Sequence, residues 1–377
     1  MNYKNAYIYT EDFRFVKGGF SVEDGKFTNV LKEQEDAVDL DGAYVIPGLI
    51  DVHTHGSMGK DFSDGDTDGD LAMAKYYARE GVTSFAPATM TLPYDVIAKA
   101  LAAGRVLRDA EKGEYGVISR LLGAQMEGPF FSEKKKGAQN GAYLRLPDFA
   151  AFEQLQKDSD GMILIADLAP ELEGAADFAA KAKELCTVSI AHTDASYEDA
   201  KAAIDAGVTH LTHLYNAMPP IHHRKPGVIG AASENDAVTA EIICDGIHVH
   251  PSSVRMAFKL FGAERMCLIS DSLRCCGMPD GEYELGGQQV YLKDNVARLE
   301  DGTIAGSATN LYECMRKAVS FGIPKEDAIR AATYNPAREL RRLDLVGSIA
   351  DGKLADFVIC DEDLIRKAVY IGGQLAE

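Results

Sequence analysis

The sequence predicts an α/β fold, a (β/α)8 TIM barrel with a small β-sandwich domain formed by both chain termini. Three observations lead to this prediction. Eight apolar runs alternate with helix-forming segments between residues 49 and 271, which is typical of parallel sheets with crossover helices. Short strand-like segments occupy both chain ends. Histidines and carboxylates follow several of the apolar runs, as in barrels whose active sites lie at the C-terminal ends of the strands.

Composition narrows the class of protein. The 377 residues are 46% hydrophobic, enough for a large core, and the net charge is −19. This acidity argues against nucleic acid or an anionic membrane as a partner. The N-terminal residues MNYKNAYIYTEDF lack the regions of a signal peptide, and no apolar run is long enough to span a bilayer. We therefore expect a cytoplasmic protein whose seven cysteines are mostly reduced thiols.

The chain ends are predicted to form one small domain, residues 1–48 plus 347–377. Alternation in AYIYT and an Asp24-Gly25 turn between two strand-like runs predict a β-hairpin. A hairpin cannot bury both of its faces alone and needs a partner. The strand-and-turn pattern of GSIADGKLADFVICDED (347–363) makes the far C-terminus the expected partner.

Residues 49–346 are predicted to form the barrel. Its strand candidates are the apolar runs 49–55, 82–88, 121–127, 162–168, 186–192, 208–213, 240–246 and 267–271. Amphipathic segments such as DLAMAKYYAREG and YEDAKAAIDAG lie between them. A doubly wound sheet is the alternative fold, but the first strand is not followed by a Gly-rich phosphate fingerprint.

His53 and His55 follow the first apolar run, in the sequence IDVHTHG. Residues two apart on a strand point the same way, so both imidazoles should reach one place. Two imidazoles at a strand end form half of a metal site. Taken alone, the pair is also compatible with hydrogen-bonded polar residues at the start of a loop.

The other strand ends supply further groups, namely Glu127, His192, His213, His248 and Asp271. One carboxylate and two imidazoles, from Glu127, His192 and His213, suit Zn²⁺ or Fe²⁺ with a position left open for water. Such a cation lowers the pKa of the water and polarises a substrate carbonyl. Asp271 is placed to take the water proton as general base and to return it as general acid. His210, three residues before His213, should point to the opposite side, and we interpret it as structural.

Two charged loops need separate interpretation. Arg224 and Lys225 follow the sixth strand in a proline-rich loop and suit an anionic group such as phosphate, with solvated loop charges as the alternative. The acidic run DFSDGDTDGD (61–70) resembles a calcium-binding loop from Asp64 onwards, but its twelfth position is Lys75, where a glutamate is required. We therefore expect these acids to cap the helix that follows.

Short motifs spread over nearly the whole chain resemble the amidohydrolase superfamily and, within it, the N-acetylglucosamine-6-phosphate deacetylases. PG-x-ID-x-H-x-H and the C-terminal GK-x-ADFV are superfamily-wide, whereas EGPF, THLYNAM and HHRKPG in this order are specific to the deacetylases. The matching stretches are PGLIDVHTHG, EGPF (127–130), KKGAQN (135–140), AHTDA (191–195), THLYNAM (212–218), HHRKPG (222–227), CDGIHV (244–249), ISDS (269–272), AGSA (305–308), ATYNPA (332–337) and GSIADGKLADFVI (347–359).

The resemblance implies hydrolysis of the acetamide of N-acetylglucosamine 6-phosphate to glucosamine 6-phosphate and acetate, in amino-sugar catabolism. It implies that Glu127, His192 and His213 hold the catalytic metal and that Asp271 is the general base and then the acid. Family members are typically cytosolic homodimers with the Arg224 loop near the subunit interface. The residues implied to hold the sugar phosphate are Ala138, Gln139, Asn216, Ala217, Arg224, His248, Ile304, Ala305 and Gly306.

Gln139 and the H-x-H motif bear on how the substrate carbonyl is polarised and on how many metals are bound. Some members have a histidine where Gln139 stands, and that histidine helps to polarise the amide carbonyl; Gln139 can contact the substrate only as a neutral donor. Members with H-x-H can hold two metals. We therefore expect a divalent metal, zinc first with iron or manganese as alternatives, bound tightly at one site. His53 and His55 would form a second, weaker site, since two imidazoles and a shared carboxylate are a sparse set beside a first cation.

Two other functions stay open. The first is another amidohydrolase-superfamily amidase or deaminase, acting on a different N-acyl or cyclic amide substrate. Many of those enzymes bridge two metals with a carboxylated lysine at a strand end, and none of the predicted strand ends carries a lysine. The second is a barrel protein that has lost catalysis, which the presence of all the ligand candidates and of Asp271 argues against.

Overall fold

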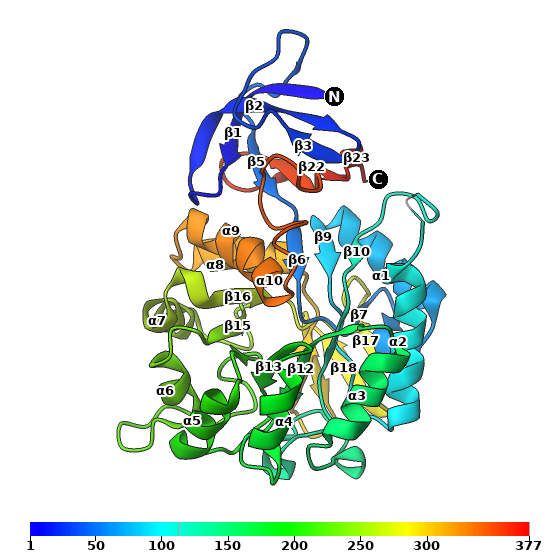
Figure 1. Cartoon of the computed structure of the whole chain (residues 1–377), viewed down its shortest axis with the longest axis vertical. Helices are drawn as coiled ribbons and strands as arrows, with labels where there is room; N and C mark the ends of the chain where they lie inside the picture. The colour runs from blue at the N-terminus through cyan, green and yellow to red at the C-terminus, as the bar shows by residue number, and fades with distance from the viewer. Residues whose placement is uncertain (112, 377) are drawn as a thin grey trace.

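Strands from both ends of the chain pair in one eight-stranded sheet, drawn at the top of Figure 1. The computed structural model describes residues 1–111 and 113–376. The strands of this sheet are β1 (Asn2–Tyr9), β2 (Phe15–Glu23), β3 (Lys26–Thr28), β4 (Val38–Asp39), β5 (Tyr44–Pro47), β21 (Phe357–Cys360), β22 (Arg366–Ile371) and β23 (Gln374–Leu375). β5 pairs in parallel with β1 and antiparallel with β21, so the two chain ends share one ladder. The sandwich form and the domain boundaries at residues 48 and 347 stay predictions.

The turn predicted at Asp24 and Gly25 is confirmed. β2 and β3 pair antiparallel on either side of it, and the two turn residues have φ of 52° and 78°, as a two-residue hairpin turn requires. Rings from both chain ends pack in the core of the sheet. The centroid of Phe20 lies 4.8 Å from that of Tyr3 and 5.2 Å from that of Phe357. Such stacked and edge contacts between buried rings stabilise the joint sheet.

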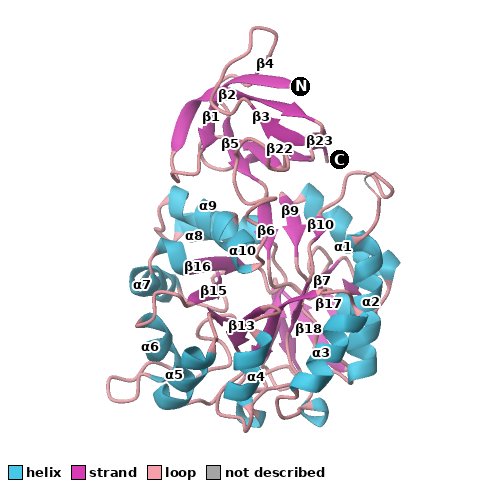
Figure 2. Ribbon diagram, viewed as in Figure 1, coloured by secondary structure: helices cyan, strands magenta, loops and turns pink. Residues whose placement is uncertain are grey.

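The middle of the chain forms a curled parallel sheet with helices on its outer side (Figure 2). Its strands are β6 (Leu49–Asp51), β9 (Val82–Phe85), β10 (Arg120–Leu121), β11 (Ala124–Met126), β12 (Ile163–Leu168), β13 (Thr187–Ile190), β14 (His210–Leu211), β15 (Thr239–Ile243) and β16 (Met266–Ile269). Each predicted apolar run overlaps one of these strands, except the run 121–127, which overlaps both β10 and β11, and most of the strands are shorter than the runs.

Two connections join the parallel strands into one curled sheet. The strands fall into a three-stranded part, β10-β9-β6, and a six-stranded part, β11 to β16. A parallel bridge between Ala88 and Gln125 links β9 to β11. At the opposite edges, the Asp271 N–H donates to the His53 carbonyl at 2.9 Å, which links β16 to β6. This arrangement is consistent with the predicted (β/α)8 barrel.

Helices and short strands complete the chain between these elements. The α-helices are α1 (Thr67–Arg79), α2 (Tyr94–Arg108), α3 (Phe149–Asp158), α4 (Ala175–Ala182), α5 (Tyr197–Ala206), α6 (Gly227–Ser233), α7 (Pro251–Phe261), α8 (Leu311–Ser320), α9 (Lys325–Ala332) and α10 (Tyr334–Glu339). The 3-10 helices and remaining strands are η1 (Phe62–Asp64), η2 (Glu133–Lys135), η3 (Gly141–Tyr143), η4 (Ala263–Arg265), β7 (Gly56–Ser57), β8 (Lys60–Asp61), β17 (Gly281–Leu285), β18 (Gln288–Lys293), β19 (Val296–Leu299) and β20 (Ile304–Ser307).

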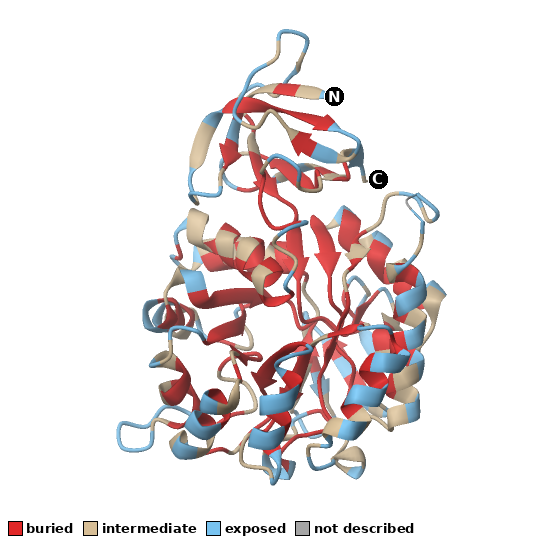
Figure 3. Ribbon diagram, viewed as in Figure 1, coloured by how far each residue is buried: buried red, intermediate tan, exposed pale blue. Residues whose placement is uncertain are grey.

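Burial explains why the central strands appear as apolar runs. β9, β13, β15 and β16 are buried along their whole length and are red in Figure 3. A parallel strand covered on both faces does not alternate between apolar and polar residues. The helices, in contrast, have one apolar face. In α5, Ala200, Ala203 and Ile204 are buried at helical spacing.

The acidic run 61–70 caps the helix that follows, α1, as predicted, and it also caps the 3-10 helix η1. Asp66 is the N-cap of α1, and its carboxylate accepts the Asp68 N–H at 3.2 Å. Asp61 caps η1 in the same way and accepts the Ser63 N–H at 2.8 Å. The run therefore serves local helix structure.

Residues 281–307 form a four-stranded antiparallel sheet, β17-β18-β19-β20, which the sequence analysis did not anticipate. A parallel bridge between Ser272 and Ser307 ties its last strand to the segment after β16. All seven cysteines are free, in line with the predicted reduced thiols, and all seven are buried. Over residues 1–111 and 113–376, no helix has both the length and the apolar character to cross a membrane.

Candidate active site

Three side chains from neighbouring strand ends meet at one point. Glu127 follows β11 directly, and His192 and His213 lie two residues beyond β13 and β14. Glu127 Oε1 lies 3.1 Å from His192 Nε2 and 3.2 Å from His213 Nε2, and the two nitrogens are 3.1 Å apart. Ligand atoms about 2.0–2.1 Å from a tetrahedral Zn²⁺ would lie about 3.3 Å from one another. The spacing of these three atoms therefore fits a single metal ion.

The protonation of His192 supports this fit. Its Nδ1 lies 2.9 Å from the Lys135 carbonyl oxygen, which can only accept, so Nδ1 carries the proton of the neutral ring. Nε2 then presents a lone pair to Glu127 Oε1 and to the second imidazole. The Phe131 ring stacks on His192 with centroids 4.5 Å apart and holds this orientation. A cation held by Glu127, His192 and His213 would replace the repulsion between their lone pairs with coordination.

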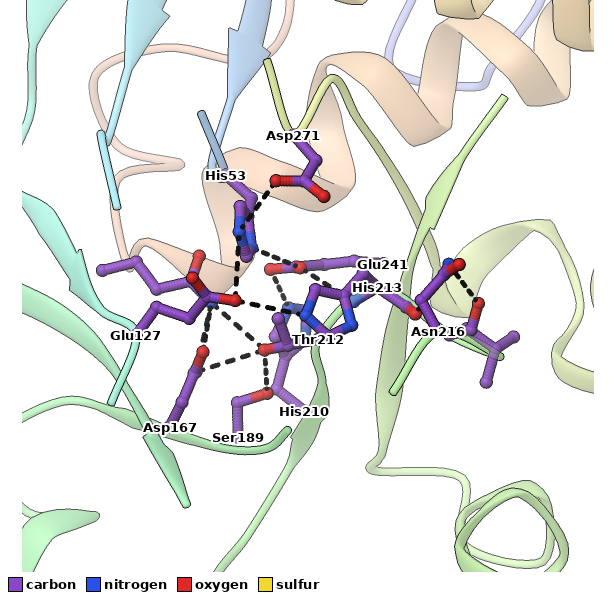
Figure 4. A network of polar contacts seen from close by, with 12 residues as sticks. His53, Glu127, Asp167, Ser189, His210, Thr212, His213, Asn216, Glu241 and Asp271 are labelled. Carbon is purple, nitrogen blue, oxygen red and sulfur yellow. Dashed lines mark hydrogen bonds and ion pairs between the residues drawn. The ribbon is translucent and has the colours of Figure 1, made fainter. Parts of the chain in front are cut away.

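A second group of side chains adjoins the first. His53 Nε2 and His55 Nε2 lie 3.6 and 3.5 Å from Asp271 Oδ1, and the three residues form a second set of candidate ligands (Figure 4 shows His53 and Asp271). Glu127 reaches both groups, because its Oε2 lies 3.2 Å from His55 Nε2. His53 Nε2 is buried and has no hydrogen-bond partner. This orphaned nitrogen fits a second cation site.

The backbone at these strand ends is strained. His192, His213 and Asp271 have φ of 43°, 34° and 49°, in the left-handed region that residues other than glycine rarely adopt. Such conformations cost about 1–3 kcal/mol each and cluster at functional sites. They turn the chain at the strand ends, which explains why these strands end before the site residues.

A cavity of about 280 Å³ opens onto both ligand groups. All the residues predicted to hold the sugar phosphate line it except Arg224: Ala138, Gln139, Asn216, Ala217, His248, Ile304, Ala305 and Gly306. The lining also includes Lys134 and Lys135 at its rim and Leu285 from the sheet that the sequence did not predict. Arg224 is exposed, with its guanidinium 2.5 Å from His223 Nε2, so a single chain does not bring it to the cavity.

Comparison with known proteins gives this site a family. The sequence model of the amidohydrolase family matches residues 44–376. The chain belongs to this family. Its curated relatives include the N-acetylglucosamine-6-phosphate deacetylase of Bacillus subtilis (strain 168), 37% identical over 96% of this chain and 93% of the relative. The N-acetylgalactosamine-6-phosphate deacetylase of Escherichia coli O157:H7 is 34% identical over 94% and 93%.

Solved structures agree with the family assignment. The crystal structure of N-acetyl-D-glucosamine-6-phosphate deacetylase from Mycobacterium smegmatis is 30% identical, with a TM-score of 0.91 over 100% of this chain and 99% of that one. The N-acetylglucosamine-6-phosphate deacetylase from Thermotoga maritima is 30% identical, with a TM-score of 0.88 over 100% and 99%. The resemblance seen in the sequence motifs is thereby confirmed.

A buried layer behind the candidate metal ligands was missed by sequence reasoning. Glu241 on β15 is fully buried; its Oε2 lies 3.1 Å from His53 Nδ1, and its Oε1 lies 3.0 Å from His210 Nε2 (Figure 4). A carboxylate behind a histidine fixes the ring so that the other nitrogen faces the metal site. His210 therefore contacts the far side of Glu241 and does not line the cavity. The signal in the sequence was a charged residue inside the apolar run AEIIC.

A second buried acid lies beneath Glu127. Asp167 at the end of β12 accepts from Gln125 Nε2 at 2.9 Å and from Thr212 Oγ1 at 3.1 Å. Burial, with the nearby charges of Glu241 and Glu127, raises the pKa of Asp167 well above its usual value. The raised pKa means that Asp167 adds little negative charge to the buried carboxylates around it.

The charged groups of the site shift one another's pKa values. Burial alone raises the pKa of Asp271, but His55 and His53 outweigh it, and the net pKa is below the usual value. Glu127 is likewise held well below its usual pKa by the surrounding histidines, against the effect of burial. Burial lowers the pKa of His53, but Glu241 and Glu127 raise it to about 9. The carboxylates of Asp271 and Glu127 are therefore anions, and the site favours bound positive charge.

Proposed function

We propose that this chain catalyses the metal-dependent hydrolysis of the acetamide of N-acetylglucosamine 6-phosphate to glucosamine 6-phosphate and acetate. The convergence of Glu127 Oε1, His192 Nε2 and His213 Nε2 within 3.2 Å of one another carries this proposal. That group opens onto a cavity lined by residues of the deacetylase motifs. The family membership and the names of the relatives support the same reaction.

Glu127, His192 and His213 would hold the catalytic cation, for which we propose zinc, with iron and manganese as alternatives. When bound, this cation would polarise the acetamide carbonyl and lower the pKa of the attacking water. His53 and His55, with Asp271, would hold a second cation more weakly. Their set has only two imidazoles, and a second positive charge is repelled by the first.

Asp271 would carry the proton through the reaction. Its carboxylate is an anion that borders the cavity, so it can accept a proton from the attacking water as the water oxygen bonds to the acetyl carbon. The same proton then passes to the sugar nitrogen as the C–N bond breaks, and the amine is released with acetic acid, which loses its remaining proton to solvent as acetate. A positioned acid–base group of this kind typically contributes ~10²–10⁴-fold to the rate.

The rest of the cavity would position the sugar phosphate. His248 is fixed for this task, because its Nδ1 lies 2.6 Å from Asp245 Oδ2. We propose that Arg224 reads the phosphate in a cytoplasmic homodimer, with its loop near the subunit interface. A (β/α)8 barrel of residues 49–346, with a terminal β-sandwich domain of residues 1–48 and 347–377, is the architecture that we propose for each subunit.

The 4-epimer, N-acetylgalactosamine 6-phosphate, is a second candidate substrate, because a deacetylase named for it is 34% identical to this chain. Both sugars offer the same acetamide and phosphate. The test is acetate release by the zinc-loaded protein from each sugar phosphate and from unphosphorylated N-acetylglucosamine. We expect the highest kcat/KM with N-acetylglucosamine 6-phosphate and loss of activity after chelation. Preference for the epimer would reassign the substrate, and no acetate from any of the three would overturn the proposal.

A further inference from the structure

We propose that Gln139 is a positioning residue that acts on Glu127, and that through Glu127 it sets how tightly the chain binds its catalytic cation. The proposal rests on the proposed role of Glu127 as a metal ligand. It differs from the expectation drawn from the family motifs, in which Gln139 meets the substrate as a neutral donor. The contacts of the Gln139 amide carry the argument.

The orientation of this amide follows from its partners. The Thr91 backbone N–H lies 2.7 Å from the Gln139 side-chain oxygen Oε1. A backbone N–H can only donate, so the oxygen must face Thr91 and the nitrogen must face the other way. Nε2 then donates to Glu127 Oε2 at 2.7 Å. Gln139 is only 3% exposed, so water does not compete for either bond.

The position of Gln139 is fixed on three sides. Its own backbone N–H donates to the Lys136 carbonyl at 2.9 Å. The preceding carbonyl, that of Ala138, accepts a hydrogen bond from the Gln288 side chain on β18. The amide is therefore anchored by its loop and by Thr91 before it reaches Glu127.

The two carboxylate oxygens of Glu127 have different partners, and Gln139 contacts only one of them. Oε1 faces His192 and His213, whereas Oε2 faces His55 and receives the Gln139 donor. Without that donor, Oε2 keeps only His55 as a partner, and the carboxylate can rotate more easily and offer either oxygen to either ligand group. The amide thus holds Oε1 in place for the first cation. Partners that orient a metal ligand typically contribute ~10–100-fold to metal affinity.

The test is zinc affinity in the absence of substrate, measured by competition with a chromophoric chelator. Gln139→Met keeps the length of the side chain and removes the donor, and Gln139→Ala is a second variant in case methionine perturbs the fold. We expect both to bind the tight zinc ~10–100-fold more weakly. At saturating zinc, their KM for N-acetylglucosamine 6-phosphate should stay close to that of the wild type. Gln288→Ala is the matched control, since it removes an amide that anchors the same loop without touching Glu127, and its zinc affinity should fall much less than that of the Gln139 variants.

The outcomes separate this inference from the proposed function. Unchanged zinc affinity in the Gln139 variants, together with a higher KM or a lower kcat, would overturn the inference and return Gln139 to the substrate. An equal loss of zinc affinity in Gln288→Ala would also overturn it, because the effect would then belong to the loop. A wild-type chain that binds no zinc tightly would instead overturn the proposed function. Thermal unfolding of the zinc-free variants must match that of the wild type for the comparison to count.

Discussion

The buried carboxylate of Glu241 allows a direct perturbation of the second ligand group. Glu241→Gln keeps the shape of the side chain and removes the charge that faces His53 Nδ1 at 3.1 Å and His210 Nε2 at 3.0 Å. A hydrogen bond to a charged group is worth roughly 1.5–3 kcal/mol, or about ten- to a hundredfold in a binding constant. We therefore expect the second, weaker zinc to bind about 10–100-fold less tightly in this variant. The first zinc should be retained, because Glu241 meets its ligands only at the backbone N–H of His213, 3.2 Å from Oε2, and a glutamine oxygen can still accept that bond.

Zinc titration against a competing chelator resolves the two binding steps. Glu339→Gln is a matched control, since Glu339 Oε2 lies 3.8 Å from His210 Nδ1, one residue further from the ligand groups. Both binding constants should be unchanged in that control. A Glu241→Gln protein that loses the first zinc, or that keeps both constants, would refute the reasoning.

Further predictions concern the proton carrier, the phosphate and a buried acid. Asp271→Asn should lower kcat by ~10²–10⁴-fold with the tight zinc still bound; turnover within threefold of the wild type would remove Asp271 from the mechanism. Arg224→Ala should lower kcat/KM for the phosphorylated sugar by ~10–100-fold and spare unphosphorylated N-acetylglucosamine, and equal losses would contradict a phosphate contact. Burial, together with Asp66 and Asp61, raises the pKa of Asp70 to about 8. This value lies above the unfolded pKa of about 3.9, so ionisation of the unfolded chain opposes folding by about 1.4 kcal/mol per pH unit between the two values. The gain in free energy of unfolding from Asp70→Asn should therefore grow between pH 5 and pH 8, and a gain independent of pH would show that Asp70 is not held neutral.

Local patterns predicted the elements that position the site. The apolar runs that end at Glu127, His192 and His213 each contain a buried parallel strand, because a strand covered on both faces needs uninterrupted apolar residues. The spacing of His53 and His55 likewise predicted that both imidazoles reach one place. These inferences needed only the geometry of single strands.

Contacts between distant residues were beyond such reasoning. Glu241 meets His53 across 188 positions, and Gln139 meets Thr91 across 48 positions. Neither pair has a local signature, since each depends on which strand ends become neighbours when the sheet curls. The sheet of residues 281–307 was missed because its strands are partly exposed and form no apolar run; in β18 only Val290 and Leu292 are buried.

The location of Arg224 shows a different limit. Its charge and loop pointed to phosphate, yet the side chain is exposed and does not line the cavity of a single chain. Strand and helix patterns place a residue within its own chain. They do not show whether its side chain reaches the active site of another subunit. The homodimer stays a proposal. The Arg224→Ala kinetics test one part of it, the contact between Arg224 and the substrate phosphate.

The central claim is that Glu127, His192 and His213 hold the tight cation, and zinc content per chain tests it most directly. Elemental analysis after dialysis would compare His213→Ala with the double variant His53→Ala/His55→Ala. We predict that the double variant keeps one tightly bound zinc, because its Glu127, His192 and His213 are intact, and that His213→Ala retains none. A double variant without zinc, beside a His213→Ala protein that keeps it, would show that the tight site belongs to the other ligands.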